Sequence, residues 1–198
     1  MVPKGTLMPF ELVVVGTSWG GFQALKTLLT GLPAGFGCAV AIAQHRSSDP
    51  AGDLAAMLQR SCCLPVAEPD DKEEIIPGRV YLAPAGYHLL VECGSFALSV
   101  EAPVWHARPS IDVLFESAAE TYGERVIGII LTGTSQDGAR GLAAIKQRGG
   151  FAIVQAPDDA ERRELPAAAL AATRVDRILP LARIAPELAS LCHSAVRS

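Results

Sequence analysis

The sequence predicts an α/β fold: a doubly wound, mostly parallel sheet with an antiparallel hairpin and helices on both faces. The chain has 198 residues, 49% hydrophobic and 19% charged, a size and composition that suit one globular domain. Short apolar runs alternate with segments of helical spacing, as in repeated βα units. Glycine and proline separate these segments. We therefore expect residues 1–198 to form one domain, with 1–10 as an N-terminal extension.

The first part of the chain predicts two strand–helix units. Residues 11–16 (ELVVVG) and 38–44 (CAVAIAQ) are continuous apolar runs, which is typical of strands buried on both faces. Residues 20–31 carry large apolar residues at helical spacing, and the following Leu-Pro ends that helix. Residues 50–60 have the same spacing and predict a second helix.

The middle of the chain predicts short strands instead of strand–helix units. The expected strands are separated by Pro-Gly and Gly-containing turns, and they cover residues 64–67, 79–83, 87–93 and 96–100. Cys93-Gly94-Ser95 is typical of a tight hairpin turn. We interpret the whole stretch as an antiparallel excursion within the same domain.

The alternation of strands and helices then resumes until the C-terminus. The expected strands are β-branched runs at 125–131, 151–155 and 175–179. The expected helices, of which the second ends at Gly149-Gly150, cover 110–122, 138–148, 166–172 and 184–195.

Charge and cysteine content narrow the class of protein. The net charge of −4 disfavours a nucleic-acid partner, because phosphate binding needs a basic surface. The five cysteines include no C-x-x-C pair and predict free thiols in the cytoplasm. The histidines and cysteines lack metal-ligand spacing, so we expect no metal and no cofactor. No apolar run reaches 18 residues and the N-terminus lacks a signal peptide, so we expect no membrane insertion.

Three loops that each follow a predicted buried strand carry the residues of a serine hydrolase. They are G-T-S-W-G-G with Ser18, Q-H-R with His45, and T-G-T-S-Q-D-G with Asp137. The carboxyl ends of parallel strands share one edge of a sheet, so these three side chains should face one crevice. A hydroxyl, an imidazole that takes its proton and a carboxylate that orients the imidazole form a catalytic triad.

The first loop has two other interpretations, a phosphate-binding loop or a plain tight turn. A dinucleotide site would need G-x-G-x-x-G, but Ser18 stands at the second glycine and the next strand ends in Gln44-His45. The order Ser, His, Asp also differs from that of ordinary α/β-hydrolases. Small residues around Ser18 instead favour a nucleophile elbow at the start of a helix, whose N–H groups can bind an oxyanion.

Several motifs in register make the chain resemble a known family. V-V-G-T-S-W-G-G, A-Q-H, A-P-A-G-Y-H, R-P-S-I-D-V-L-F and L-T-G-T-S-Q-D-G closely resemble the catalytic domain of the chemotaxis receptor methylesterase (CheB) family, over about residues 12–191. The resemblance implies Ser18 as nucleophile, His45 as general base and Asp137 as orienting carboxylate. It implies hydrolysis of methyl esters on glutamate side chains of methyl-accepting chemoreceptors, which releases methanol, and a related deamidation of receptor glutamines.

The remaining site assignments concern the pocket wall. The backbone N–H groups of Trp19 and Thr134 are candidates for the oxyanion hole, and Arg108 and Gln136 for substrate contact. Thr134 stands where the family usually has Met, Ser135-Gln136 replace Gly-Asn, and Trp19 is bulkier than the usual residue.

Other interpretations of these residues stay open. Asp137 is also a candidate N-cap of the helix expected at 138, Ser110 or Asp112 of the helix expected at 110, and His88 a turn or strand residue. Family members often carry a receiver domain of the phosphorelay type, and only about ten residues precede the first expected strand here. The alternatives to the methylesterase are a non-catalytic signalling and docking module, or an esterase on another acylated substrate.

Overall fold

A seven-stranded parallel sheet forms the centre of the protein. The computed structural model describes residues 10–46 and 53–192. The strand order is β3-β4-β2-β1-β7-β8-β9, and every pair of neighbours is parallel. The strands are β1 (Leu12–Thr17), β2 (Ala39–Gln44), β3 (Val66–Ala67), β4 (Val80–Leu82), β7 (Val126–Ile130), β8 (Phe151–Gln155) and β9 (Arg177–Leu179). Strands β1, β2 and β7 are buried along their whole length, as expected for apolar strands covered on both faces.

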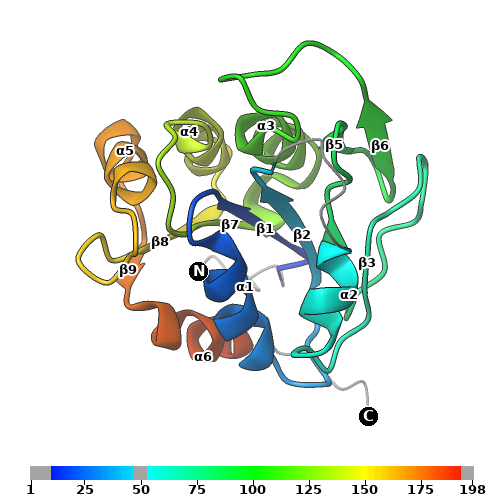
Figure 1. Ribbon diagram of the computed structural model, residues 1–198, viewed down its shortest axis with the longest axis horizontal. Coiled ribbons are helices and arrows are strands. Elements are labelled where there is room, and N and C mark those ends of the chain that lie inside the picture. Colours follow the sequence, from blue (N-terminus) through cyan, green and yellow to red (C-terminus); the bar gives the residue numbers. More distant parts are fainter. Residues whose placement is uncertain (1–9, 47–52, 193–198) are drawn as a thin grey trace, which may run out of the picture.

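Helices cover both faces of the sheet, so the expected doubly wound fold is confirmed (Figure 1). One apolar core lies between the sheet and the helices α1 (Gly21–Thr30), α2 (Leu54–Gln59) and α6 (Leu181–Leu191). The other lies between the sheet and α3 (Ile111–Tyr122), α4 (Ala139–Gln147) and α5 (Glu164–Ala172). A short 3₁₀ turn, Gly123–Arg125, joins α3 to β7.

The winding of the chain reverses between β1 and β7. From β1 the sheet grows through β2 to β4 and β3, whereas β7 starts the opposite half that continues through β8 to β9. A reversal of this kind leaves a crevice at the carboxyl ends of the strands that flank it. The loops after β1, β2 and β7 therefore meet at one place, and they are the three loops that carry Ser18, His45 and Asp137.

The antiparallel arrangement expected for residues 64–100 is wrong for the first two strands and right for the last two. Strands β3 and β4 extend the main sheet in parallel with β2. Only β5 (His88–Val91) and β6 (Phe96–Ser99) form an antiparallel pair, turned by Gly94 in a left-handed conformation. The short strand Val80–Leu82 is fully buried, as its position between β3 and β2 requires. Its three residues give no pattern from which the direction of the strand can be predicted.

Two helices begin earlier than the sequence predicts. Helix α5 starts at Glu164, so Pro166 lies inside its first turn, where the missing backbone N–H has no helical partner to lose. Helix α6 starts at Leu181, directly after Pro180. Residues 50–52 and 193–195 of the expected helices lie outside the described residues. Within the ranges 10–46 and 53–192, no helix is long and apolar enough to cross a membrane.

Candidate active site

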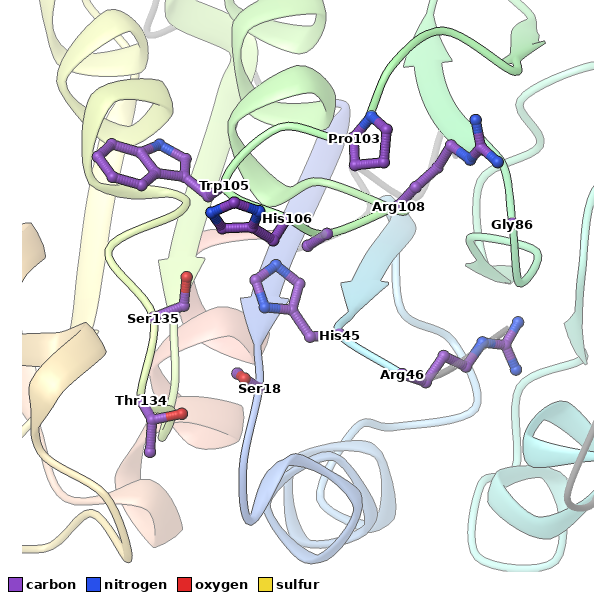
Figure 2. Close-up of a pocket in the computed structure, with 11 residues that line it drawn as sticks. Ser18, His45, Arg46, Gly86, Pro103, Trp105, His106, Arg108, Thr134 and Ser135 are labelled. Carbon is purple, nitrogen blue, oxygen red and sulfur yellow. The ribbon is translucent and has the colours of Figure 1, made fainter. Parts of the chain in front are cut away.

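The three loops line one pocket at the carboxyl edge of the sheet. Ser18 directly follows β1, His45 directly follows β2, and Asp137 lies in the loop between β7 and α4. Ser18 and His45 line a cavity of about 550 Å³, together with Thr134 and Ser135 of the third loop. Figure 2 shows the imidazole of His45 beside Ser18, with one ring nitrogen turned toward the serine.

The sheet fixes the spacing of Ser18 and His45. The backbone N–H of Ser18 donates to Thr132 O over 3.0 Å, and the N–H of His45 donates to Thr17 O over 3.0 Å. Both bonds continue the parallel ladders one step beyond the strands. Gln44 then ties the two loops together, because its Nε2 donates to Ser18 O and to His45 O, each over 2.8 Å.

Two glycines allow the loops to approach this closely. A Cβ at Gly133 would lie 2.8 Å from the Ser18 Cβ, and one at Gly21 would lie 2.0 Å from Gln44 Oε1. Both distances are far below van der Waals contact. A side chain at Gly133 would push the third loop away from Ser18, and one at Gly21 would displace the Gln44 amide that ties the first two loops together. The backbone of the third loop therefore packs directly against Ser18, next to Thr134.

The imidazole of His45 is held in one orientation by Asp137. Its Nε2 lies 2.7 Å from Asp137 Oδ2, and the carboxylate is fully buried. An ionised carboxylate only accepts hydrogen bonds, so Nε2 carries the proton of the neutral ring and Nδ1 keeps its lone pair. This arrangement leaves Nδ1 as the atom of His45 that can take a proton from the serine.

Asp137 stays ionised because four donors surround it. Besides His45, Oδ1 accepts from Ser110 Oγ (2.8 Å) and Asp112 N (2.9 Å), and Oδ2 accepts from Ile111 N (2.7 Å). Burial alone would raise the pKa of this carboxyl, but the hydrogen bonds from His45, Asp112 and Ile111 outweigh it and lower the pKa below the ordinary value. The positive end of α3 lies at the same place and also favours the charge.

Asp137 and Asp112 cap each other's helices. Asp137 binds the first N–H groups of α3, whereas Asp112 Oδ1 accepts from Gly138 N (2.8 Å) and Gly141 N (2.7 Å) at the start of α4. The expectation that Asp137 caps its own following helix is therefore wrong, and Gly138 occupies that N-cap. Burial and the neighbouring charge of Asp137 raise the pKa of Asp112, although the two glycine N–H groups oppose the rise. The exchange fixes α3 against α4 and thereby places Asp137.

The donors expected for an oxyanion are available. Within the described part of the chain, the backbone N–H groups of Trp19 and Thr134 form no hydrogen bond. Nor does the Ser18 hydroxyl bond to His45 among these residues, which is common in enzymes without substrate because such contacts tighten only when substrate binds.

The other residues that the sequence assigns to the site, Trp19, Arg108 and Gln136, do not lie together. Trp19 is 60% exposed beside the nucleophile, with its Nε1 donating to Glu161 Oε1 over 3.2 Å. Arg108 lines the pocket, but its guanidinium donates to Val100 O (2.7 Å) and Glu101 O (2.9 Å) and points away from Ser18 (Figure 2). Gln136 lines a neighbouring hollow between α4 and α5.

Comparison with known proteins places this site in a family. Residues 13–188 match the family described as CheB methylesterase. The chain belongs to that family. A protein of Leptospira interrogans is 46% identical over 179 residues, which make up 90% of this chain and 93% of that protein. The protein-glutamate methylesterase/protein-glutamine glutaminase 1 of Carboxydothermus hydrogenoformans is 40% identical over 186 residues, and the chain spans 55% of its length.

The fold agrees with a solved member of the CheB methylesterase family. The crystal structure of the Thermotoga maritima CheB methylesterase catalytic domain superposes with a TM-score of 0.87 at 31% identity, covering 93% of this chain and all of that one. A likeness at this level of identity supports the same arrangement of the sheet and its loops.

Four residues that the sequence did not assign to the site support it in the structure. Gln44 joins the first two loops, Ser110 and Asp112 hold Asp137, and His88 hydrogen-bonds to Ser110. The R-P-S-I-D motif signalled Ser110 and Asp112 as helix starters, and Ser110 is indeed the N-cap of α3. Nothing in the local sequence links either residue to position 137, because the contact depends on the packing of α3 against α4.

Proposed function

We propose that this protein is a protein-glutamate methylesterase that hydrolyses methyl esters of glutamate side chains in methyl-accepting chemoreceptors. The observation that carries the proposal is the 2.7 Å bond from His45, which lines a pocket together with Ser18, to a fully buried, ionised Asp137. Membership of the CheB methylesterase family and the names of its relatives supply the reaction class.

The proposed reaction begins with acylation of the serine. His45 Nδ1 takes the proton of the Ser18 hydroxyl while its oxygen attacks the ester carbonyl. The negative charge that develops on the carbonyl oxygen is bound by the N–H groups of Trp19 and Thr134. Asp137 stabilises the imidazolium through Nε2. The imidazolium then protonates the leaving oxygen, so the ester C–O bond breaks and methanol departs.

A water molecule completes the cycle. His45 deprotonates the water, which attacks the acyl carbon, and the proton returns to Ser18 as the glutamate leaves. The same steps deamidate a glutamine, with ammonia in place of methanol, in agreement with the double name of the Carboxydothermus relative.

The walls of the pocket suggest how the substrate is held. Trp105 lines the pocket and Trp19 follows Ser18 in the chain. They are 56% and 60% exposed and offer apolar surface for a protein substrate. The substrate contact expected for Arg108 and Gln136 stays a prediction, because the Arg108 guanidinium is turned away from Ser18 and Gln136 lines a neighbouring hollow. A receptor protein is the partner, and the reaction takes place in the cytoplasm, where the five cysteines, all free in this structure, would stay reduced.

Methanol release from methylated receptor tests the proposal. Ser18→Ala should abolish release while its circular dichroism and melting temperature stay unchanged, because Ser18 is a partly exposed loop residue. Ser61→Ala is a matched control, since Ser61 lies beside Thr30 at the far end of α1 and should keep full activity.

A fluorophosphonate probe distinguishes the alternatives. The wild type should be labelled at Ser18, and Ser18→Ala should not. A non-catalytic docking module would show no labelling, and an esterase for another substrate would be labelled without releasing methanol from receptors. Either result would overturn the methylesterase proposal.

A further inference from the structure

We infer that His88 is a positioning residue of the triad: its neutral imidazole sets the carboxylate of Asp137 through Ser110 and anchors the pocket wall through Ala102. The inference rests on the proposed function, because it concerns the same reaction. His88 opens strand β5, outside the main sheet, and only 2% of its surface is exposed.

Both ring nitrogens of His88 are engaged. Nδ1 lies 3.2 Å from the backbone N of Ser110, and Nε2 lies 3.1 Å from Ala102 O. The N–H of Ser110 can only donate and the carbonyl of Ala102 can only accept. These partners fix one neutral tautomer, with the proton on Nε2. A doubly protonated ring would place its Nδ1–H against the N–H of Ser110.

Ser110 contacts both His88 and the carboxylate of Asp137. Ser110 Oγ donates to Asp137 Oδ1 over 2.8 Å, and the next two residues, Ile111 and Asp112, donate their backbone N–H groups to the same carboxylate. Three of the four hydrogen bonds that the Asp137 carboxylate accepts therefore come from the segment 110–112. His88 holds the first residue of that segment.

The contact with Ala102 reaches the substrate pocket. Residues 100–110 connect β6 to α3 and include Trp105, His106 and Arg108 of the pocket wall (Figure 2). Ala102 lies near the start of this loop and Ser110 at its end, so the ring of His88 bridges the base of the loop. One side chain thus connects the wall that meets substrate with the carboxylate that orients the base.

Two variants separate these contacts. In His88→Asn, the amide oxygen can occupy the place of Nδ1 and accept from Ser110, but Ala102 loses its donor. In His88→Gln, the amide nitrogen can occupy the place of Nε2 and donate to Ala102, but Ser110 loses its acceptor. Each variant leaves one backbone group unpaired, so both should lower the melting temperature by similar amounts.

The two variants should differ in kcat and KM. We expect His88→Gln to lower kcat by about 10- to 100-fold with little change in KM, since small displacements of reacting groups cost rates of this order. We expect His88→Asn to keep kcat within about threefold, because the orientation of Asp137 is preserved, and to raise KM. The proton NMR signal of His45 Nε2–H should shift in His88→Gln and stay in place in His88→Asn.

Fluorophosphonate labelling of Ser18 keeps this test independent of the receptor. The labelling rate should fall in His88→Gln and hold in His88→Asn. The inference would be overturned if both variants lost kcat and labelling rate equally, in proportion to the decrease in their melting temperatures. That result would show that His88 only stabilises the fold. A wild type that is not labelled at all would refute the proposed function instead.

Discussion

Replacing Asp137 by Asn tests the electrostatics of the site most directly. The carboxylate lies 2.7 Å from His45 Nε2. In the proposed reaction this ring becomes positively charged. With about 4 Å between the centres of charge and an effective dielectric constant of about 20, the attraction is about 4 kcal/mol. Loss of that attraction corresponds to about a 10³-fold fall in kcat, since each factor of ten equals about 1.4 kcal/mol.

The orientation of the new amide adds to the loss. An Asn has one acceptor oxygen where Asp137 has two, and each carboxylate oxygen now accepts two hydrogen bonds. If the amide nitrogen faces His45, the imidazole must adopt the other tautomer and loses its free lone pair toward Ser18; in the Ser-His-Asp template such a change costs about 10⁴ in kcat. We therefore expect a fall of about 10³- to 10⁴-fold.

Asp112→Asn is the matched control for this experiment. Asp112 is equally buried and caps the partner helix, but its side chain does not contact His45. Both variants should lose about 1–3 kcal/mol of unfolding free energy, because each places an amide N–H against a buried donor. Methanol release and urea unfolding would be measured for both. If Asp137→Asn kept more than about a tenth of the wild-type kcat, or if Asp112→Asn lost as much activity, the electrostatic role of Asp137 would be refuted.

Three further outcomes follow from the site. Gly133→Ala should lower kcat more strongly than the unfolding free energy, because the added Cβ would lie 2.8 Å from the Ser18 Cβ. The control Gly35→Ala has open space around its Cβ and should change neither methanol release nor urea unfolding. Ser110→Ala should lower kcat by about 10- to 100-fold, as expected when a hydrogen bond to a charged group worth about 1.5–3 kcal/mol is lost; an unchanged kcat would contradict its role. The unfolding free energy of the wild type should exceed that of Asp137→Asn above the ordinary carboxyl pKa of 3.8 and lose this advantage at lower pH, because the folded pKa of Asp137 is lowered. Urea titrations from pH 7 downward would measure the difference, and an advantage that grows with acidity would contradict the assigned sign.

The sequence alone predicted most of the parallel sheet, its helices and the grouping of the proposed triad residues, because each rests on a local pattern. Continuous apolar runs identified the buried strands, and the residues just after them had to lie at one edge of a parallel sheet. For this reason Ser18, His45 and Asp137 could be grouped although Ser18 and Asp137 belong to distant segments. Short strands such as Val80–Leu82 offered too few residues for their direction to be predicted.

Tertiary structure decided how the carboxylate is held. Asp137 caps α3 and not its own helix, Asp112 returns the contact to α4, and His88 reaches Ser110 from a strand outside the main sheet. These bonds join residues 22 to 29 positions apart, and they form only when α3 packs against α4 and β5. Hydrogen bonds depend on distance and angle between groups, and a sequence gives the types of those groups but not their separation in space.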